Sequence, residues 1–225
     1  RVVLEMFGHQ MAAWQQIIIF VALASIIVGA LGAIGQTNLK RILAFSSINN
    51  VGFILIGLAA GTREGVSGML VYLAIYLAMT VGSFACIMML TGRNGEPAET
   101  LRDIAGLSKV RPGVALMLAM FMWSLAGIPP LFGFWGKLVV FNAAVGAGLL
   151  WLAVIGIAAS VIGAFYYLRI VKSMYFDDPD YSPAVTKVTE LDWVAMVAAV
   201  FVSPLGYLTI PWLGALADKA AGSLF

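Results

Sequence analysis

A double proline and a lysine interrupt a long apolar stretch of the chain, residues 113–145. Within it, the chain reads Gly127-Ile128-Pro129-Pro130-Leu131-Phe132-Gly133-Phe134-Trp135-Gly136-Lys137. The two prolines remove two backbone N–H donors, so the sequence predicts a broken helix here rather than a continuous one. We expect Gly127, Pro129 and Pro130 to carry the break.

The composition around this stretch is that of an integral membrane protein. Of 225 residues, 62% are hydrophobic and 11% are charged, whereas soluble domains are about 45–50% apolar and about 25% charged. The 13 Lys and Arg and 11 Asp and Glu cannot cover the surface of a soluble protein of this size. A net charge of +2 gives no nucleic-acid signature. The single cysteine excludes a disulfide framework and a multi-cysteine cluster within the chain.

The spacing of the charges predicts six membrane-spanning helices, because a helix needs about 20 apolar residues to cross the hydrocarbon core. The predicted spans are residues 14–34, 42–61, 66–92, 113–145, 149–176 and 191–216. The fourth contains the proline break, and the sixth a predicted kink at Pro204. The expected fold is an all-α, polytopic membrane helix bundle with one broken helix.

The basic residues predict the orientation of these spans. One end collects nine of them: Lys40, Arg41, Arg93, Arg102, Lys109, Arg111, Arg169, Lys172 and Lys187. The other end collects three: Arg1, Arg63 and Lys219. Since loops rich in Lys and Arg stay inside, the nine-residue end should face the cytoplasm, or the matrix in an organelle. Residues 1–7 read like the tail of an upstream helix, so we expect a longer protein.

Lys137 is the one ionisable residue deep inside an apolar stretch. A lysine near the bilayer centre costs roughly 2.5–3.5 kcal/mol on insertion scales. Reaching the outer surface would take it about 12 Å along the helix, which is long for a lysine stem. Burial makes an ammonium group easier to deprotonate. The lysine beside a helix break therefore predicts a proton relay; snorkelling and a simple proline kink are the alternatives.

Two segments resemble a known family. Residues 124–130 with 133–137 closely resemble the broken helix of the antiporter-like subunits of NADH:quinone oxidoreductase (respiratory complex I), and residues 36–48 resemble a turn between two other helices of that family. The pattern Phe134-Trp135-Gly136-Lys137 is similar to one subunit type more than to its siblings. The resemblance covers essentially the whole chain.

The resemblance implies the second half of an inverted-repeat antiporter-like fold. Residues 1–13 would end an upstream helix and form an outer loop, 14–176 would be the second five-helix repeat, and 177–225 a linker with the C-terminal transmembrane helix. It implies a proton-translocating subunit with Lys137 as relay.

The resemblance also implies where the cofactors bind. NADH, FMN, iron–sulfur clusters and quinone are expected elsewhere in the complex, and no cofactor or metal site is expected in this chain. The implied partners are neighbouring antiporter-like subunits, small helical subunits, lipid and protons, but no nucleic acid. The implied location is the bacterial inner membrane, or the mitochondrial inner membrane.

Polar residues on the second and third predicted helices are candidates for a water path. They are Ser46, Ser47, Asn49 and Asn50, followed by a stripe of Tyr72, Tyr76, Thr80 and Ser83 at helical spacing. Contacts between helices are the alternative role. Relatives often carry histidine where this chain has Asn50, which can bond water but not carry a proton.

Other residues have plainer explanations. Tyr166 and Tyr167 are expected to anchor the helix at the membrane interface, and the lone His9 is not expected to bind metal. Close helix packing is the expected role of a glycine stripe: Gly29, Gly32 and Gly35.

Two other functions are alternatives to a role in complex I. One is a free-standing cation/proton antiporter; however, a sodium site needs oxygen ligands, and no carboxylate lies in the interior of a predicted span. The other is a scaffold in which the lysine is structural.

Overall fold

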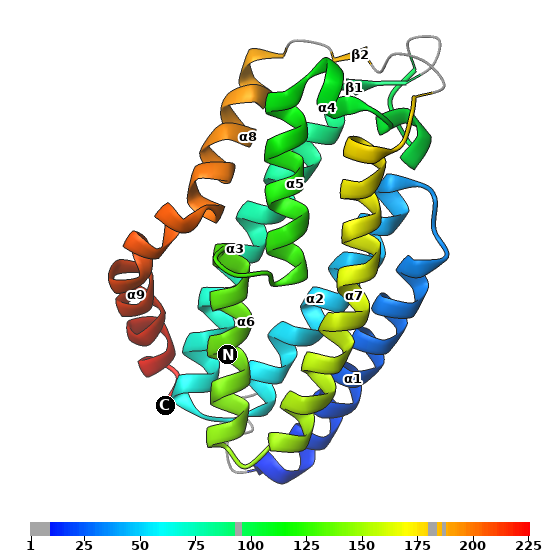
Figure 1. Ribbon diagram of the computed structural model, residues 1–225. Helices are drawn as coiled ribbons and strands as arrows, with labels where there is room; N and C mark the ends of the chain where they lie inside the picture. Colours follow the sequence, from blue (N-terminus) through cyan, green and yellow to red (C-terminus); the bar gives the residue numbers. More distant parts are fainter. Residues whose placement is uncertain (1–9, 93–95, 180–183, 186–187) are drawn as a thin grey trace.

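Four long apolar helices form the frame of the computed structural model, which describes residues 10–92, 96–179, 184–185 and 188–225 (Figure 1). They are α1 (Met11–Ile34), α2 (Leu39–Ala59), α3 (Arg63–Met88) and α7 (Leu150–Phe176). Each is long and apolar enough to cross a bilayer. These helices confirm four of the six predicted spans, the first, second, third and fifth.

Polar side chains define where two of these helices begin. The side chain of Asn38 accepts the N–H of Arg41 at the start of α2, and Thr62 accepts the N–H of Gly65 at the start of α3. Such caps satisfy backbone donors that have no partner within the helix. The polar turns between the apolar segments therefore fix the helix ends.

The fourth and sixth predicted spans are each made of two helices. The fourth is α5 (Pro112–Ala126) and α6 (Phe132–Gly146), and α6 lies below α5 in Figure 1. The sixth is α8 (Thr189–Val202) and α9 (Ile210–Gly222), joined through the 3-10 helix η5 (Pro204–Thr209) with a bend of 69°. Six spans were predicted, the fourth broken and the sixth kinked; among the described residues the structure has four long helices, one bent pair and two shorter apolar helices.

A small sheet departs from the predicted all-α fold. Strands β1 (Leu90–Thr91) and β2 (Ala184–Val185) pair antiparallel next to the polar loop between α3 and α5. That loop also holds the 3-10 helix η4 (Leu101–Ile104) and α4 (Leu107–Val110). Backbone outside the apolar segments needs other partners for its N–H and C=O groups, and a short strand pair supplies them.

Glycines set the closest helix contacts. A Cβ on Gly29 would lie 2.5 Å from the backbone nitrogen of Asn49, and a Cβ on Gly32 would lie 2.4 Å from the ring of Phe45. These two glycines let α1 approach α2 closely, as predicted. Gly35 has nothing within 4 Å of its Cβ position, so the prediction of close packing was wrong there.

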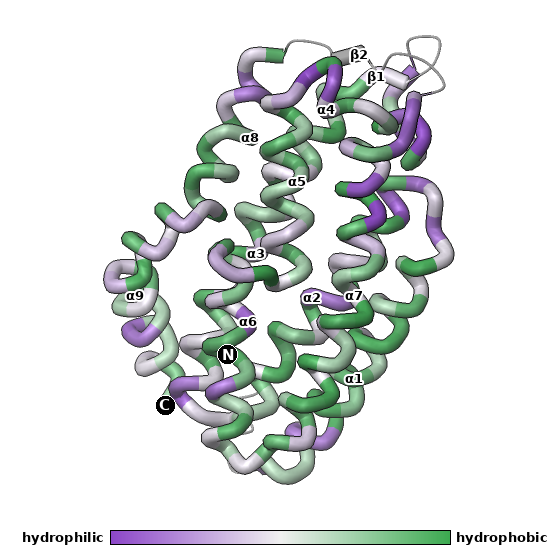
Figure 2. The backbone as a smooth tube through the Cα atoms, in the orientation of Figure 1, coloured by the Kyte–Doolittle hydropathy of each residue, from purple (hydrophilic) through white to green (hydrophobic). Residues whose placement is uncertain are grey.

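The two ends of the bundle differ in polarity. Figure 2 shows hydrophilic segments gathered at the upper end, around α4 and β2. At this end Arg169 donates to the carbonyls of Ile34 and Gln36, and Lys40 pairs with Glu99 at 2.8 Å. We call this end, where α1 ends and α2 begins, the basic end, and the opposite end the outer end.

Candidate functional site

A turn between α5 and α6 opens the backbone at mid-height of the bundle (Figure 1). Gly127 ends α5 in the left-handed conformation with φ 86°. The N–H of Gly133, in the first turn of α6, donates to Ser124 Oγ at 2.9 Å. Pro129 and Pro130, joined by a cis peptide bond, lie in the turn. The structure therefore places the three predicted break residues between two helices.

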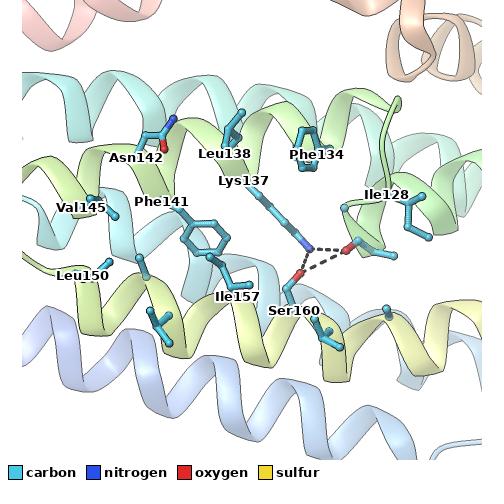
Figure 3. A pocket seen from close by; sticks show the side chains of 16 residues that line it. Ile128, Phe134, Lys137, Leu138, Phe141, Asn142, Val145, Leu150, Ile157 and Ser160 are labelled. Carbon is cyan, nitrogen blue, oxygen red and sulfur yellow. Dashed lines mark hydrogen bonds between the residues drawn. The ribbon is translucent and has the colours of Figure 1, made fainter.

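The ammonium group of Lys137 lies against the end of α5. Lys137 is 5% exposed, and its Nζ donates to the carbonyl of Leu125 at 2.8 Å and to that of Ala126 at 3.2 Å. A third bond joins Nζ to Ser160 Oγ of α7 at 2.8 Å (Figure 3). Nζ also lies 4.8 Å from the ring centroid of Phe53, within the range of a cation–π contact.

The helix end explains why these carbonyls are available. The last four carbonyls of an α-helix have no partner within the helix. The N–H of Gly127 bonds those of Trp123 and Ser124, and Lys137 bonds the remaining two, of Leu125 and Ala126. Because the carboxyl end of a helix carries partial negative charge, it favours a cation. The break thus supplies the acceptors that hold a charged lysine inside the fold.

Carboxylates are not the partners of this lysine. Within the described ranges, the ion pairs are Lys40–Glu99, Lys109–Asp178 and Lys172–Asp177, all exposed. The same ranges contain no group of three or more His, Cys, Asp or Glu side chains that could hold a metal ion. The ammonium is therefore held by dipoles and a hydroxyl rather than by a counter-ion.

Gly127 leaves the space that the lysine occupies. A Cβ at Gly127 would lie 3.1 Å from Lys137 Cδ and 3.3 Å from Nζ. Residues with a side chain also rarely adopt its positive φ. A glycine at this position is therefore needed for both the turn and the lysine.

An apolar groove of about 450 Å³ borders the site between α6 and α7. Its wall includes Leu138, Phe141, Val154, Ile157 and Val161 (Figure 3). Lys137 and Ser160 lie along it, but apolar side chains line most of its surface. The groove therefore offers water few bonding partners.

A second cluster of polar side chains lies on the basic side of the lysine. We call it the tyrosine–asparagine cluster, and its members are Ser46, Asn49, Asn50, Tyr72, Tyr166 and Tyr167. Tyr72 donates its hydroxyl to Asn50 Oδ1 at 2.6 Å, and Asn50 Nδ2 donates to the hydroxyl of Tyr167 at 3.0 Å. Ser46 Oγ lies 2.6 Å from the same Tyr167 hydroxyl. Three helices, α2, α3 and α7, thus share one buried hydrogen-bond network.

Asn49 extends the cluster toward α1 and the middle of α7. Its Nδ2 donates to the hydroxyl of Tyr166 at 3.2 Å. Beside the cluster, Tyr76 donates to Ser47 Oγ at 2.7 Å. Buried polar groups that bond one another in this way fix the register of neighbouring helices.

The predicted stripe on α3 is divided between two kinds of partner. Tyr72 and Tyr76 bond side chains of α2, whereas Ser83 donates to the carbonyl of Met79 in its own helix. Thr80 is half-buried between them. Of the predicted water-path residues, the structure brings together Ser46, Asn50 and Tyr72 in one network and Ser47 with Tyr76 in a second pair.

Two glycines bring the cluster next to the lysine site. A Cβ at Gly136 would lie 2.4 Å from the ring of Tyr72, so that ring packs directly against the backbone beside Lys137. A Cβ at Gly163 would lie 3.3 Å from Asn49 Nδ2 and 3.5 Å from the Tyr166 hydroxyl. Gly163 is one helical turn from Ser160. The two polar sites are therefore neighbours, about one turn apart along α7.

The interface role predicted for Tyr166 and Tyr167 was wrong. Both are fully buried, and their rings lie 4.3 Å apart between centroids. They lie deeper than expected because α7 continues past them to Phe176, and its last turns contact η4. His9 lies outside the described residues.

Ser160 is the residue of this candidate site that sequence reasoning missed. A serine in an apolar helix is common and bonds its own backbone as readily as a neighbour. Its partner Lys137 lies 23 residues away, so no local pattern joins them. The one available signal was that Ser160 is the first hydroxyl in α7, following the run 150–159 of apolar residues.

The chain is similar to a family of membrane proteins. Residues 1–163 match the model described as NADH:quinone oxidoreductase/Mrp antiporter, TM. Over its full length, the chain is 63% identical to NADH-quinone oxidoreductase subunit N of Erythrobacter litoralis and 56% identical to that of Rhizorhabdus wittichii. It covers 46% and 47% of these proteins, so it spans about half the length of the curated relatives it matches.

Solved structures show the same fold. The chain is similar to a chain of respiratory complex I from Thermus thermophilus, with a TM-score of 0.77 and 28% identity, over 87% of this chain and 45% of that one. A chain of the Mrp complex from Dietzia gives a TM-score of 0.85 at 23% identity, over 100% of this chain and 49% of that one. At 23% identity, the similarity to the Mrp complex chain shows a shared fold and nothing more.

Proposed function

The chain belongs to the NADH:quinone oxidoreductase/Mrp antiporter transmembrane family, and we propose that it works as part of subunit N of a proton-translocating NADH:quinone oxidoreductase. The identity to subunit N proteins over the whole chain supports this assignment. Within the subunit, residues 14–176 act as the second antiporter-like repeat, and residues 177–225 form the linker and the C-terminal span.

The observation that carries the proposal is the buried Lys137 at the helix break. In its charged form, the ammonium donates to the carbonyls of Leu125 and Ala126 and to Ser160. Among the described residues no buried carboxylate has to be neutralised together with it, so a single proton changes the charge of the site. Lys137 thus binds one proton, holds it at Nζ and releases it when the field around the site changes.

The tyrosine–asparagine cluster, with Ser47 and Tyr76, supports a path for protons to this lysine. Its hydroxyls and amides are buried and bonded to one another, and each hydroxyl keeps a further lone pair that a file of water molecules can use along its walls. Thr80 and Ser83 continue the path along α3 toward the basic end. Asn50 bonds water but does not itself carry a proton at neutral pH.

The membrane arrangement has six crossings in this proposal. The pair α5 and α6 crosses once with a break, and the pair α8 and α9 crosses once with a bend. The four long helices, the bent pair and the two shorter apolar helices on either side of the break support this arrangement. The basic end faces the cytoplasm of a bacterial cell, with the chain in its inner membrane.

Electron transfer belongs to other subunits in this proposal. NADH, FMN, iron–sulfur clusters and quinone bind elsewhere in the complex, and this chain contacts neighbouring antiporter-like subunits, small helical subunits and lipid. A sodium-coupled antiporter is less well supported, because sodium needs several oxygen ligands, whereas the acceptors at this site already bond an ammonium group.

The test is Lys137→Ala in the full-length protein, within the enzyme assembled in native membranes. We expect both NADH-driven quinone reduction and the proton gradient to fall, since the proton has lost its carrier. Lys219→Ala is the matched control, because Lys219 is an exposed lysine near the outer end. If Lys137→Ala leaves the rate and the gradient unchanged, Lys137 is structural or the protein serves a separate antiporter.

A further inference from the structure

Lys137 divides the surrounding helices into a polar half and an apolar half. On its basic side lie Ser160 and the tyrosine–asparagine cluster. On its outer side, residues 51–60 of α2 and 150–159 of α7 contain no hydroxyl, amide or charged side chain. The outer part of α6, residues 138–146, contains only Asn142, which is exposed.

The outer part of α3 is equally poor in free polar groups. Beyond its first turn, residues 66–71 contain one polar side chain, Ser67, whose hydroxyl donates to the side chain of Asp218 in α9. That bond lies toward the outer end, about 7.5 Å along α3 from Tyr72, which begins the polar stripe. Apart from Ser67 and the exposed Asn142, these segments of the helices around the lysine present polar groups on the basic side.

Two phenylalanines fill the centre of the apolar half. Phe53 of α2 and Phe141 of α6 meet edge to face, with ring centroids 5.9 Å apart. Phe53 is fully buried and Phe141 is 8% exposed. Because the Lys137 ammonium lies 4.8 Å from the Phe53 centroid, these rings are its immediate neighbours on the outer side.

A glycine of α7 closes the remaining space. A Cβ at Gly156 would lie 2.7 Å from Phe141 Cε1 and 3.0 Å from Ile56 Cδ1. The Phe141 ring and Ile56 thus pack directly onto the backbone of α7. Helices α2, α6 and α7 meet here through apolar atoms in van der Waals contact, and the groove that passes them between α6 and α7 is lined mostly by apolar side chains, which give a file of water few partners.

The basic side is built in the opposite way. Asn49 Oδ1 is buried and has no hydrogen-bond partner among the described residues. The Nδ2 atom of the same side chain and the Tyr166 hydroxyl lie beside Gly163, one helical turn from Ser160. A buried acceptor with polar neighbours is a position that water can occupy, because a water molecule needs two to four polar partners.

We propose that Phe53, Ile56 and Phe141 form an outer seal, so that in this conformation Lys137 exchanges protons with the basic end alone, past Ser160, Gly163 and Asn49. The proposal rests on the relay role proposed for Lys137 and gives that relay a direction. Apolar constrictions block water by dewetting, and a proton in water does not cross them. Release toward the outer end then requires the Phe53–Phe141 contact to open.

The test is a passive leak measurement on Phe141→Ser in the full-length protein, within the enzyme assembled in native membrane vesicles. A pH gradient is imposed without NADH, and its decay is followed with a pH-sensitive dye. We expect decay several-fold faster than in wild-type vesicles, because serine admits water past the seal to Lys137. In the double variant Phe141→Ser/Lys137→Ala, decay should return to the wild-type rate, since the carrier is gone.

Controls separate the seal from general damage. Phe165→Ser changes a ring of α7 that is 55% exposed and lies outside the seal, and the gradient should decay as in wild-type vesicles. Phe53→Leu opens the same seal from α2 with a smaller loss of volume, and should leak if Phe141→Ser fails to assemble. Wild-type decay in assembled Phe141→Ser and Phe53→Leu, or a leak that persists in the double variant, would overturn the seal. A different result would contradict the relay role itself: unchanged proton pumping in the single variant Lys137→Ala.

Discussion

The charge on Lys137 depends on acceptors from two separate helices. The end of α5 supplies two carbonyls, and α7 supplies the hydroxyl of Ser160. Ser160 also lies 3.4 Å from the carbonyl of Ala126, so its hydroxyl has two possible roles there, accepting from the lysine and donating to the helix end. In the relay role proposed for Lys137, Ser160 is therefore a positioning residue.

Replacing Ser160 with alanine should weaken proton pumping while the enzyme still assembles. The variant removes one bond to a charged group, and such bonds are worth about 1.5–3 kcal/mol. Proton flux and NADH oxidation in membrane vesicles measure the effect, and both should fall. Ser160→Thr keeps a hydroxyl and should restore most of the flux. Equal losses in the alanine and threonine variants would mean that the side chain only fills space.

Residue chemistry decides what the sequence could reveal of this site. Lys137 and the prolines were predictable, because a charge or a missing N–H inside an apolar stretch is anomalous in itself. Tyr166 and Tyr167 were misplaced, because their proximity to Arg169 and Lys172 suggested an interface, whereas the fold buries them between helices. Hydrogen bonds between side chains far apart in sequence leave no such local trace.

At the scale of helices, α1 and α2 approach each other through Gly29. The approach brings the Gly29 Cβ position within 2.5 Å of the backbone nitrogen of Asn49. Backbone cannot rotate away as a side chain can, so the helices must separate to accept a methyl group. Because Asn49 belongs to the tyrosine–asparagine cluster, the spacing of these helices also sets the geometry of that cluster.

Gly29→Ala should lower the stability of the protein, and Gly35→Ala should not. Overpacking of this kind costs typically 1–3 kcal/mol. Gly35 is the C-cap residue that directly follows α1, has φ −80° and has nothing within 4 Å of its Cβ position. The midpoint of thermal unfolding of the purified enzyme in detergent reports the difference. A similar loss in both variants would show that α1 tolerates no side chain for reasons other than contact with α2.

Helix boundaries were predictable where polar turns interrupt the apolar segments. Asn38 and Thr62 begin helices within three residues of the predicted spans, because their side chains cap the first turn. The division of residues 191–216 was predicted only as a kink at Pro204. The structure instead has the six-residue 3-10 helix η5 and a 69° bend, which depend on packing of η5 against Phe132 and Leu131 of the break.

The whole molecule has one end rich in basic residues, and its orientation in the membrane follows from them. Lys109 lies at the basic end, with a side chain 65% exposed, and Lys219 is exposed near the outer end. The cysteine of this chain, Cys86, is buried. Introduced cysteines at the two lysines are therefore the accessible thiols of this region.

Lys109→Cys should react with a membrane-impermeant thiol reagent only from the cytoplasmic side, and Lys219→Cys only from the outside. Everted and right-side-out vesicles distinguish the two sides, in a background where cysteines elsewhere in the full-length protein are replaced. The unsubstituted background is the control for Cys86. Labelling of both positions from one side would mean that the helices cross the membrane an even number of times between them, rather than three times. Labelling in the reverse sense would invert the orientation.

Gly127 has a consequence for how this protein tolerates change. The left-handed turn at Gly127 and the side chain of Lys137 occupy the same few ångströms, so a change at either position affects which residues the other position tolerates. A scan of single replacements would score Gly127 as essential for folding, since any side chain there both strains the turn and displaces the ammonium from its carbonyls. Only a double variant separates the two effects. A shorter residue at position 137 would relieve the crowding caused by a side chain at position 127, but it would leave the strain of the left-handed turn.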